Sequence, residues 1–397
     1  MLIAGEASGD LLAAELVGAL RERVLKGSFE PTDDVQPLRT ELAPHFFGAG
    51  GSHMKAAGVD LAFDMTEHSV IGISEVFKKY LQFRRLFKQL LKLAIERLPD
   101  FIIGVDYGGF NLRFGKAIKH YVREHRTEFV PWNPKIVQFI SPQVWASRPN
   151  RGWTLADNYD LLLSIFPFEK QWYAKRVPRL RVEFVGHPMV ERFQRLKIHT
   201  SKSAIPAGTP LVLLLPGSRK RELQRHLPVM LGSLKLIQEK ISAVRVKMVL
   251  SNDPFVQLAK SLGAPPGVEI QIGNLPQALA QSDLAIASTG TVTVECAYFG
   301  VPTVTLYKLS WGEYQFAKRI VTVDSATMPN LLAGEEIYPE FIQHAATPEN
   351  IARAALGLLQ DAPRRQTVKV KLANVVASLG GPGATSRAAE AIVSLLK

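Results

Sequence analysis

The chain has 397 residues, of which 47% are hydrophobic and 21% are charged, and its formal net charge is +12. This composition is typical of a globular protein, and the length predicts two domains rather than one. The positive charge favours anionic partners, such as nucleic acid, anionic lipid or phosphorylated small molecules, without choosing among them.

The one cysteine, Cys296, excludes an intrachain disulfide and fits a reducing compartment. No stretch has the roughly 18 uncharged apolar residues that a membrane span needs. The first residues, "MLIAGEASGD", lack the basic start and long apolar run of a signal peptide. The sequence therefore predicts a cytoplasmic protein that is soluble or attached to a surface.

Short apolar runs alternate with helical patterns along the first half of the chain. Near-continuous apolar runs of this length predict strands that are buried on both faces of a parallel sheet. A long surface loop is expected at 27–44. The expected strands are 2–5, 45–48, 101–105, 135–140, 161–165 and 182–186, and the expected helices include 9–25, 75–98 and 112–125.

The segment 186–210 is polar and interrupted by Pro and Gly, which indicates a link between domains. Two series of strands and helices predict an α/β protein with two doubly wound, Rossmann-like domains that face a central cleft. The expected strands of the second series are 211–216, 244–250, 268–272, 283–287 and 303–307. The expected limits are 1–190 for the N-terminal domain, 191–209 for the linker and 210–397 for the C-terminal domain, whose last helix is able to pack back on the first domain.

The stretch "FIIGVDYGGFN" places Asp106 at the carboxyl end of a buried strand, followed by Gly108 and Gly109. A carboxylate in this position, beside glycines that let a substrate approach, is suited to general base catalysis. The alternative is that Asp106 caps the following helix or holds a loop.

The stretch "LLLLPGSRKREL" joins a strand to a helix through Gly217, Ser218 and Arg219. Backbone amides at a helix start, a hydroxyl and a guanidinium can together bind a diphosphate. A capped helix with exposed charges is the alternative. Glu222 is expected in the first helical turn.

A second loop of this kind, "STGTVTVE", contains Gly290 and Thr291 and leads into a helix that carries Glu295. Two loops of small residues at helix starts in one domain favour an anionic, nucleotide-like ligand. Glu295 is suited to accept hydrogen bonds from ribose hydroxyls, and a solvated glutamate is the alternative.

Two further loops follow expected strands in the first half. "SPQVWASRPNRGW" combines Trp145 and Trp153 with Arg148 and Arg151, which suits a sugar or a lipid phosphate, although a packed Trp is the commoner outcome. "LIAGEASGD", which contains Ser8, is a strand, a turn and a helix start that either faces a ligand or is only a tight turn. The nine histidines show no metal-ligand spacing.

The segment 75–98 contains neither Gly nor Pro and is both apolar and basic. On a helical projection Arg84 and Lys88 fall inside the apolar arc, where a buried helix would rarely accept them. A helix in a lipid interface accepts them, because their side chains can reach phosphates. This membrane interpretation is favoured over a core-packed helix with a basic outer face. Its expected contact residues are Lys78, Phe83, Arg84, Arg85, Phe87 and Lys88.

Along nearly its whole length the chain resembles the lipid-A-disaccharide synthase family of bacterial inverting glycosyltransferases. The resemblance implies a two-domain GT-B fold that binds the nucleotide mainly in the C-terminal half. The matching stretches occur in the family's order and are "AGEASGD", "GVDYGGFN", "SPQVWASRPNR", "FPFEKQWY", "FVGHPMVE", "LLPGSRKREL", "STGTVTVE" and "FAKRIVTVDSATMPNLLAGEEIYPEFIQ".

The resemblance also implies the reaction. The family transfers 2,3-diacylglucosamine from UDP-2,3-diacylglucosamine to the 6-hydroxyl of 2,3-diacylglucosamine 1-phosphate, which gives the tetraacyl disaccharide 1-phosphate and UDP without a metal or cofactor. The family's key aspartate falls on Asp106, its phosphate-site arginine on Arg219, its donor-site asparagine on Asn330, and its Gly-Thr-x-x-x-Glu element on Gly290, Thr291 and Glu295. Gly217 and Ser218 are further donor-binding candidates. The acceptor or loop candidates are Ser8, Gln143, Arg148 and Arg151.

The chain departs from the family pattern in its loop 27–44, which looks longer than usual, and at two motif positions. Gly108-Gly109 stands where the family usually has Pro-Asp, and Ser147 stands where a second Trp is common. The alternatives to this function are another UDP-sugar GT-B enzyme and a non-catalytic, membrane-surface relative that binds nucleotide. No motif supports nucleic-acid binding. We expect a cytoplasmic enzyme, peripheral on the inner face of the inner membrane and in contact with an anionic surface, and leave open a homodimer.

Overall fold

The computed structural model describes residues 1–27, 44–65, 76–125, 127, 131–196 and 209–396. The chain forms two compact units, Met1–Pro188 with Gly380–Lys397, and Met189–Leu379. The expected loop 27–44 lies almost wholly outside the described residues. The expected linker, 191–209, begins inside a helix of the second unit, and most of the rest of it is likewise outside the described part.

The first unit is built on a parallel sheet with the strand order β3-β2-β1-β4-β5-β6-β7. Its strands are short and mostly apolar, which suits burial on both faces. They are β1 (Leu2–Ala4), β2 (Phe47–Gly50), β3 (Asp60–Asp64), β4 (Phe101–Val105), β5 (Lys135–Phe139), β6 (Leu161–Ser164) and β7 (Val182–Phe184). The helices are α1 (Ala7–Gly27), α2 (Ser52–Ala56), α3 (Val76–Arg97), α4 (Gly108–His125), α5 (Val144–Ser147), α6 (Arg151–Asn158), α7 (Pro167–Arg176) and α17 (Ala384–Val393), followed by the 3-10 helix η3 (Ser394–Leu396).

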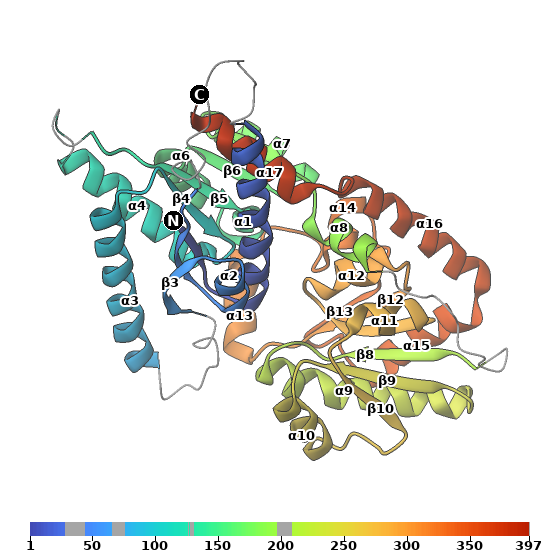
Figure 1. Cartoon of the computed structure of the whole chain (residues 1–397). Helices are drawn as coiled ribbons and strands as arrows, with labels where there is room; N and C mark the ends of the chain where they lie inside the picture. The colour runs from blue at the N-terminus through green and yellow to red at the C-terminus, as the bar shows by residue number, and fades with distance from the viewer. Residues whose placement is uncertain (28–43, 66–75, 126, 128–130, 197–208, 397) are drawn as a thin grey trace. The chain divides into compact units, whose positions relative to one another are not determined.

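Helices cover both faces of this sheet. α3 and α4 lie on one face, and α1 lies on the other with α17 beside it (Figure 1). Leu90 of α3 and Phe114 and Ile118 of α4 are buried in the core on the first face. On the second face Arg23 of α1 donates to Glu390 of α17 at 2.7 Å. The first unit therefore includes α17, although α17 follows the second unit in the sequence.

The second unit repeats the plan with the strand order β10-β9-β8-β11-β12-β13, again all parallel. The strands are β8 (Leu211–Leu215), β9 (Arg245–Leu250), β10 (Val268–Ile272), β11 (Leu284–Ser288), β12 (Thr303–Tyr307) and β13 (Glu340–Ile342). The helices are α8 (Pro188–Arg195), α9 (Lys220–Lys240), α10 (Asp253–Ser261), α11 (Leu275–Gln281), α12 (Val292–Tyr298), α13 (Trp311–Ile320), α14 (Met328–Ala333), α15 (Pro348–Gln360) and α16 (Ala362–Ser378).

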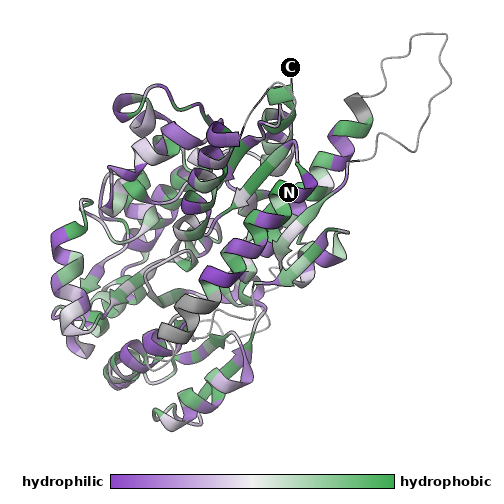
Figure 2. Ribbon diagram, turned by 90° about the vertical axis from the view of Figure 1, so that its left-hand side faces the viewer, coloured by the Kyte–Doolittle hydropathy of each residue, from purple (hydrophilic) through white to green (hydrophobic). Residues whose placement is uncertain are grey.

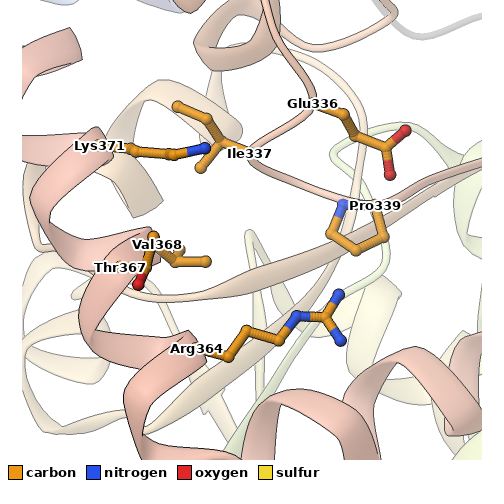
Figure 3. A pocket seen from close by; sticks show the side chains of 7 residues that line it. All are labelled: Glu336, Ile337, Pro339, Arg364, Thr367, Val368 and Lys371. Atoms are coloured by element: carbon orange, nitrogen blue, oxygen red, sulfur yellow. The ribbon is translucent and has the colours of Figure 1, made fainter.

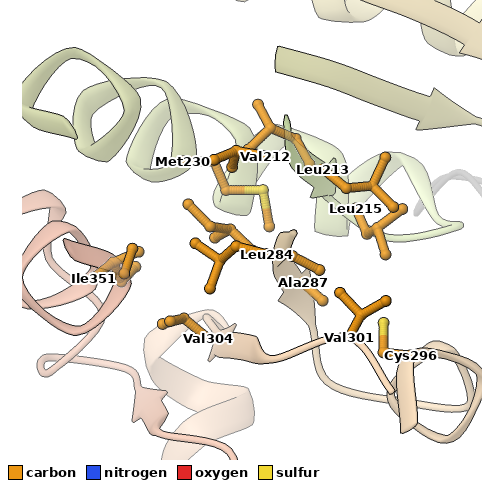
Figure 4. Close-up of a cluster of buried hydrophobic side chains, with 14 of the residues drawn as sticks. Val212, Leu213, Leu215, Met230, Leu284, Ala287, Cys296, Val301, Val304 and Ile351 are labelled. Carbon is orange, nitrogen blue, oxygen red and sulfur yellow. The ribbon is translucent and has the colours of Figure 1, made fainter. Parts of the chain in front are cut away.

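The core of the second unit shows why its central strands need no polar residue. Leu213 of β8 and Leu284 of β11 are fully buried in one core cluster that also contains Met230 of α9 and Ile351 of α15 (Figure 4). Helices on both faces exclude water from such strands, so a continuous apolar run is stable there.

The predicted fold class is confirmed, because both halves form doubly wound parallel sheets. The eleven expected strands are present within about two residues of their expected limits. Two strands were missed, β3 and β13. Both are edge strands, and β3, "DLAFD", has one side toward solvent and no continuous apolar run.

Hydrophilic residues interrupt the hydrophobic ones along the helices (Figure 2). Within the ranges given above, no helix combines the length and the apolar content that crossing a membrane requires.

Candidate active site at the switch points of the two sheets

In each sheet the strand order reverses between two neighbouring strands. The reversal falls between β1 and β4 in the first unit and between β8 and β11 in the second. Connections leave such neighbours in opposite directions, which opens a crevice beyond their carboxyl ends where ligands bind. The segments that follow these strands are those around Ser8, Asp106, Ser218 and Gly290. Four of the expected loops therefore lie at the two switch points.

Asp106 has an unusual backbone conformation. Its φ is +51° and that of Tyr107 is +46°, so two consecutive residues with side chains adopt the left-handed region. Each such residue costs about 1 kcal/mol or more, and the cost persists only where surrounding contacts enforce the conformation. Such strain in a loop at a switch point points to a functional position.

Two buried side-chain amides provide those contacts, and we call Asn111 and Gln138 the amide clamp. Asn111 Nδ2 and Gln138 Nε2 each donate to the carbonyl oxygen of Asp106 at 2.8 Å. The N–H of Asp106 donates to the carbonyl of Phe139 at 2.9 Å. Both amides are almost fully buried, with 2% and 0% of their surface exposed. The main chain of Asp106 is thus held at both its polar groups.

Glycines beside Asp106 permit close packing. A Cβ on Gly5 would lie 2.3 Å from the ring of Tyr107, and one on Gly108 would lie 2.7 Å from the Cβ of Pro142. Gly109 is different, because a Cβ there would meet no atom within 4 Å. The carboxylate that the family usually carries at that position would therefore find open space.

The electrostatic setting of Asp106 involves a residue that the sequence analysis did not single out. Burial raises the pKa of Asp106, the nearby carboxylate of Glu6 raises it further, and a hydrogen bond from the N–H of Tyr107 opposes both. Glu6 also raises the pKa of Tyr107, after burial. A signal was available, since Glu6 and Asp106 follow strands that pair side by side, with Ala4 opposite Val105. A carboxyl with a raised pKa is suited to accept a proton near neutral pH.

The loop after β8 is a capped helix start. Glu222 lies in the first turn of α9, as expected, and its Oε2 accepts from the N–H groups of Ser218 at 3.1 Å and Arg219 at 3.3 Å. Gly217, with φ +114°, leaves room for this carboxylate. The side chain of Arg219 is 71% exposed, and its guanidinium lies 3.4 Å from the carboxylate of Glu222. The two amides expected for a diphosphate are therefore occupied by the chain's own carboxylate, while the guanidinium faces solvent.

The loop after β11 is open. Gly290 has φ +138°, no atom lies within 4 Å of the place of its Cβ, and both Gly290 and Thr291 are exposed. Glu295 follows in α12. Burial raises its pKa to about 7, and the charge of Arg192 in α8 works against that rise. Exposed backbone next to a half-buried carboxyl is a suitable arrangement for a polar ligand.

Asn330 is placed differently from what the family resemblance implied. It is 1% exposed, and its Nδ2 donates to the carbonyl of Tyr338 and to Glu340, each at 2.8 Å. Its Oδ1 accepts from the N–H groups of Ile337 at 2.9 Å and Tyr338 at 2.8 Å. An amide can make four hydrogen bonds, and here the chain uses all four. The side chain holds the segment 337–340 in place. It has no hydrogen-bonding capacity left with which to bind a UDP-sugar.

The acceptor candidates lie at the carboxyl edge of the first sheet. Ser8 is exposed in the first turn of α1, Gln143 and Arg148 are exposed at the two ends of α5, and Arg151 is half-buried at the start of α6. Trp145, in the same loop, is buried and donates from Nε1 to Glu169 at 2.9 Å, so it is the packed Trp of the alternative interpretation.

The described part of α3 corrects the membrane interpretation in part. Phe87 packs against Phe110 and Phe114 of α4, with ring centroids 5.4 Å and 5.6 Å away, and Phe83 packs on the same core. These rings therefore belong to the fold, because the helix uses its apolar face for packing. Arg84, Arg85 and Lys88 are exposed, so no charge is buried by that packing. The side chain of Lys78 lies outside the described residues.

Two hollows lie away from these loops. One of about 220 Å³ is lined by residues of α16 and of the segment 336–339, and Lys371 and Arg364 point toward it (Figure 3). An open groove of about 410 Å³ runs between β3 and α3. None of the expected catalytic or donor-binding residues lines either hollow.

The fold and the placement of these loops define a protein of the GT-B class, which includes sugar-nucleotide glycosyltransferases and related epimerases. Solved structures with this fold include MnaA of S. aureus in complex with UDP, with a TM-score of 0.64 at 14% identity over 100% of this chain and 96% of that one. A calicheamicin glycosyltransferase matches with a TM-score of 0.55 at 16% identity over 96% of this chain and 94% of that one.

Relatives with higher sequence identity identify the family of this chain. A family model described as lipid-A-disaccharide synthetase matches residues 1–393. Lipid-A-disaccharide synthases of Syntrophus aciditrophicus and Solibacter usitatus are 34% and 35% identical, and each match covers 100% of this chain and 97% of the relative. The chain belongs to the lipid-A-disaccharide synthase family, and it is a hexosyltransferase of lipid A biosynthesis. The resemblance in the sequence motifs is thereby confirmed.

Proposed function

We propose that the protein transfers 2,3-diacylglucosamine from UDP-2,3-diacylglucosamine to the 6-hydroxyl of 2,3-diacylglucosamine 1-phosphate, with Asp106 as the general base. The observation that carries the proposal is the setting of Asp106. It is a strained carboxyl at a switch point, with a clamped main chain and a raised pKa. Family membership supports the identity of both substrates.

The chemistry follows from the position of the base. The ionised Asp106 accepts the proton of the acceptor hydroxyl while the hydroxyl oxygen forms a bond to the anomeric carbon. The bond from that carbon to the UDP oxygen breaks on the opposite face, which inverts the configuration, and UDP leaves with the electron pair. A base whose pKa lies nearer neutrality removes the proton more readily once it is ionised.

The second unit supplies the proposed donor site. Arg219 contacts the diphosphate, because an exposed guanidinium makes strong, charge-assisted bonds to phosphate oxygens. Diphosphate access to the Ser218 and Arg219 amides requires the Glu222 carboxylate to move away. The exposed backbone at Gly290 and Thr291 and the carboxyl of Glu295 receive the nucleoside. Asn330 acts behind the site, through the segment that it holds.

The first unit is the proposed location of both the acceptor site and the membrane-facing surface. Ser8, Gln143, Arg148 and Arg151 are the proposed acceptor-side residues. We also propose a peripheral position on the cytoplasmic face of the inner membrane. Arg84, Arg85 and Lys88 support it, because they leave α3 with a basic outer side that an anionic surface attracts.

The test is a transfer assay with purified protein and both lipid substrates in detergent, scored for the disaccharide product and UDP. Asp106→Asn is expected to lower kcat about 100-fold or more, the usual scale of general base catalysis, with UDP affinity unchanged by calorimetry. Near-normal turnover of this variant would show that a residue other than Asp106 is the base. A parent protein that binds UDP but forms no product would favour the non-catalytic alternative.

Arg219→Ala tests the donor site separately. It is expected to weaken UDP binding about tenfold or more, the scale of a hydrogen bond to a charged group. Arg225→Ala in the same helix is the control, since Arg225 pairs with Glu313 at 2.8 Å. Equal UDP affinity in the parent and the Arg219 variant would remove Arg219 from the site.

A further inference from the structure

Three arginines of the first unit lie near one another without acidic partners, and we call Arg113, Arg148 and Arg151 the arginine cluster. Arg113 is in the second turn of α4, Arg148 ends the short helix α5, and Arg151 begins α6. The N–H of Arg151 donates to the carbonyl of Arg148 at 3.0 Å, which ties two members together.

The paths of α4 and α6 bring the third member to the same place. α4 leaves β4 and α6 precedes β6 in a parallel sheet, so both helices run antiparallel to the strands and start at the carboxyl edge. The later part of α4 touches the end of α6 and the residues after it, since Arg123 donates to the carbonyl of Asp157 at 3.2 Å and Lys119 pairs with Asp160 at 3.0 Å. Their starts, with Arg113 and Arg151, therefore lie at the edge that also carries Asp106.

Nothing on the described chain neutralises these charges. Among the described residues, no ion pair and no side-chain hydrogen bond involves any of the three guanidiniums, whereas Arg97 and Arg179 of the same unit pair with aspartates. The pKa of Arg151 reflects this crowding of positive charge. Burial lowers this pKa most, and the charges of Arg148 and Arg113 lower it further. Like charges held together without a counter-ion cost free energy, and an anion removes that cost.

We propose that the arginine cluster binds the phosphate monoester of the sugar acceptor and gives the enzyme its preference for a phosphorylated acceptor. The inference rests on the proposed function, which places the acceptor hydroxyl at Asp106. Guanidiniums match phosphate oxygens in geometry, and the starts of α4 and α6 add partial positive charge. A phosphate held here leaves the rest of the acceptor at the edge where the base lies.

The experiment compares two acceptors in detergent, 2,3-diacylglucosamine 1-phosphate and the same lipid without its phosphate. Arg113→Gln and Arg151→Gln are made singly and together. Each single change is expected to lower kcat/KM for the phosphorylated acceptor about tenfold, and the pair more, as for lost bonds to a charged group. Turnover of the acceptor without phosphate should fall far less, so the ratio between the two acceptors is the readout, and the affinity for UDP should stay unchanged. Arg151→Lys, which keeps the charge, should retain part of the preference.

Arg123→Gln is the matched control, because Arg123 lies at the other end of α4. It should keep the parent's preference. An unchanged ratio between the two acceptors in the double variant, with the parent active, would overturn the proposal. So would loss of binding to anionic vesicles without loss of the ratio, since the cluster would then serve lipid headgroups.

A measurement of thermal stability separates this idea from the reaction itself and from misfolding. Removing like charges should leave Tm equal or higher without ligand. Glucosamine 1-phosphate should raise Tm of the parent and not that of the double variant, even if no transfer is found. A lower Tm in the absence of ligand, or equal protection of both proteins, would contradict an anion site here.

Discussion

Glu6 and Asp106 are two carboxyls from neighbouring strands, and the charge of one bears on the other. The charge of Glu6 raises the pKa of Asp106, after burial. Asp106 must be ionised to accept a proton, so its raised pKa moves the acid limb of the kcat profile to higher pH. Glu6→Gln removes one cause of the rise. The limb should then shift to lower pH, as measured by turnover across pH 4 to 9.

Glu124→Gln, at the far end of α4, is the control and should leave the limb in place. An acid limb that does not move in the Glu6 variant would mean that another group titrates in that range or that Glu6 is compensated in the complex.

The amide clamp acts on the main chain of Asp106 rather than on substrate. Asn111→Leu keeps the volume of the side chain and removes one of the two donors to the carbonyl of Asp106. The left-handed turn should relax, and a displacement of the base by a fraction of an ångström is expected to lower kcat about tenfold or more. KM for the donor and the affinity for UDP should change little. The measurement is steady-state kinetics with calorimetry on the same preparations.

Asn158→Leu provides a matched loss of a buried amide in the same unit, because Asn158 Nδ2 donates to Thr154 at 2.8 Å. Both variants can lose stability, but the Asn111 variant alone should lose kcat. An equal loss of kcat in both would show that the clamp has only a structural role.

At the scale of single elements, α3 divides its surface between the core and solvent. Its aromatic rings pack on α4, and its exposed basic residues are available to the proposed membrane surface. Each basic residue near an anionic surface contributes about 1 kcal/mol, and salt screens it. Changing Arg84, Arg85 and Lys88 to Glu should release the protein from anionic vesicles in sedimentation. Binding of the parent should decline strongly with salt, since the rings are not free to insert.

Lys235 and Lys240 of α9, changed to Glu, form the control and should leave vesicle binding nearly unchanged. If the triple variant is folded and sediments with the vesicles like the parent, then α3 serves only core packing and does not bind the membrane.

The sequence was sufficient to predict elements whose pattern depends on their own residues. Runs such as "FIIGV" and "LVLLL" are apolar throughout because helices cover both faces, and they became β4 and β8. The short edge strands β3 and β13 carry no such pattern and were missed. The helical projection of α3 identified the apolar face but not its partner, since the partner, α4, follows later in the chain.

The same distinction applies to the candidate site. Asp106 and the loops at 217–219 and 290–291 could be found because each stands directly after a strand. The proximity of Glu6, the amide clamp and the full hydrogen bonding of Asn330 depend on strand order and on partners distant in sequence. A single sequence does not contain those pairings, so the sequence located the loops but not their detailed contacts.

At the scale of the whole molecule, the first unit consists of two separate pieces of chain. The returning piece contacts the end of the first one, because Arg387 Nε donates to the carbonyl of Val185 at 2.8 Å. Ala388 and Ile392 of α17 are fully buried. Deleting 380–397 should expose that surface and lower the free energy of unfolding of the first unit by about 3 kcal/mol or more. Hydrogen exchange should show faster exchange in β1 and β4 and unchanged protection in β8 and β11.

UDP binding by calorimetry serves as the internal control, because the second unit lacks none of its residues in this deletion. Unchanged protection of β1 and β4 would show that the first unit is stable without α17.

The discontinuity also sets the order in which the two units can be completed during translation. Ribosomes release the chain from its N-terminus, and domains usually fold in that order. Here the second unit has all its residues once Leu379 has emerged, whereas the first still lacks α17. The half that carries the proposed base is begun first and completed last. Until then the surface of α1 that α17 covers stays exposed, and the unit with the proposed donor site has all its residues before the unit with the proposed base.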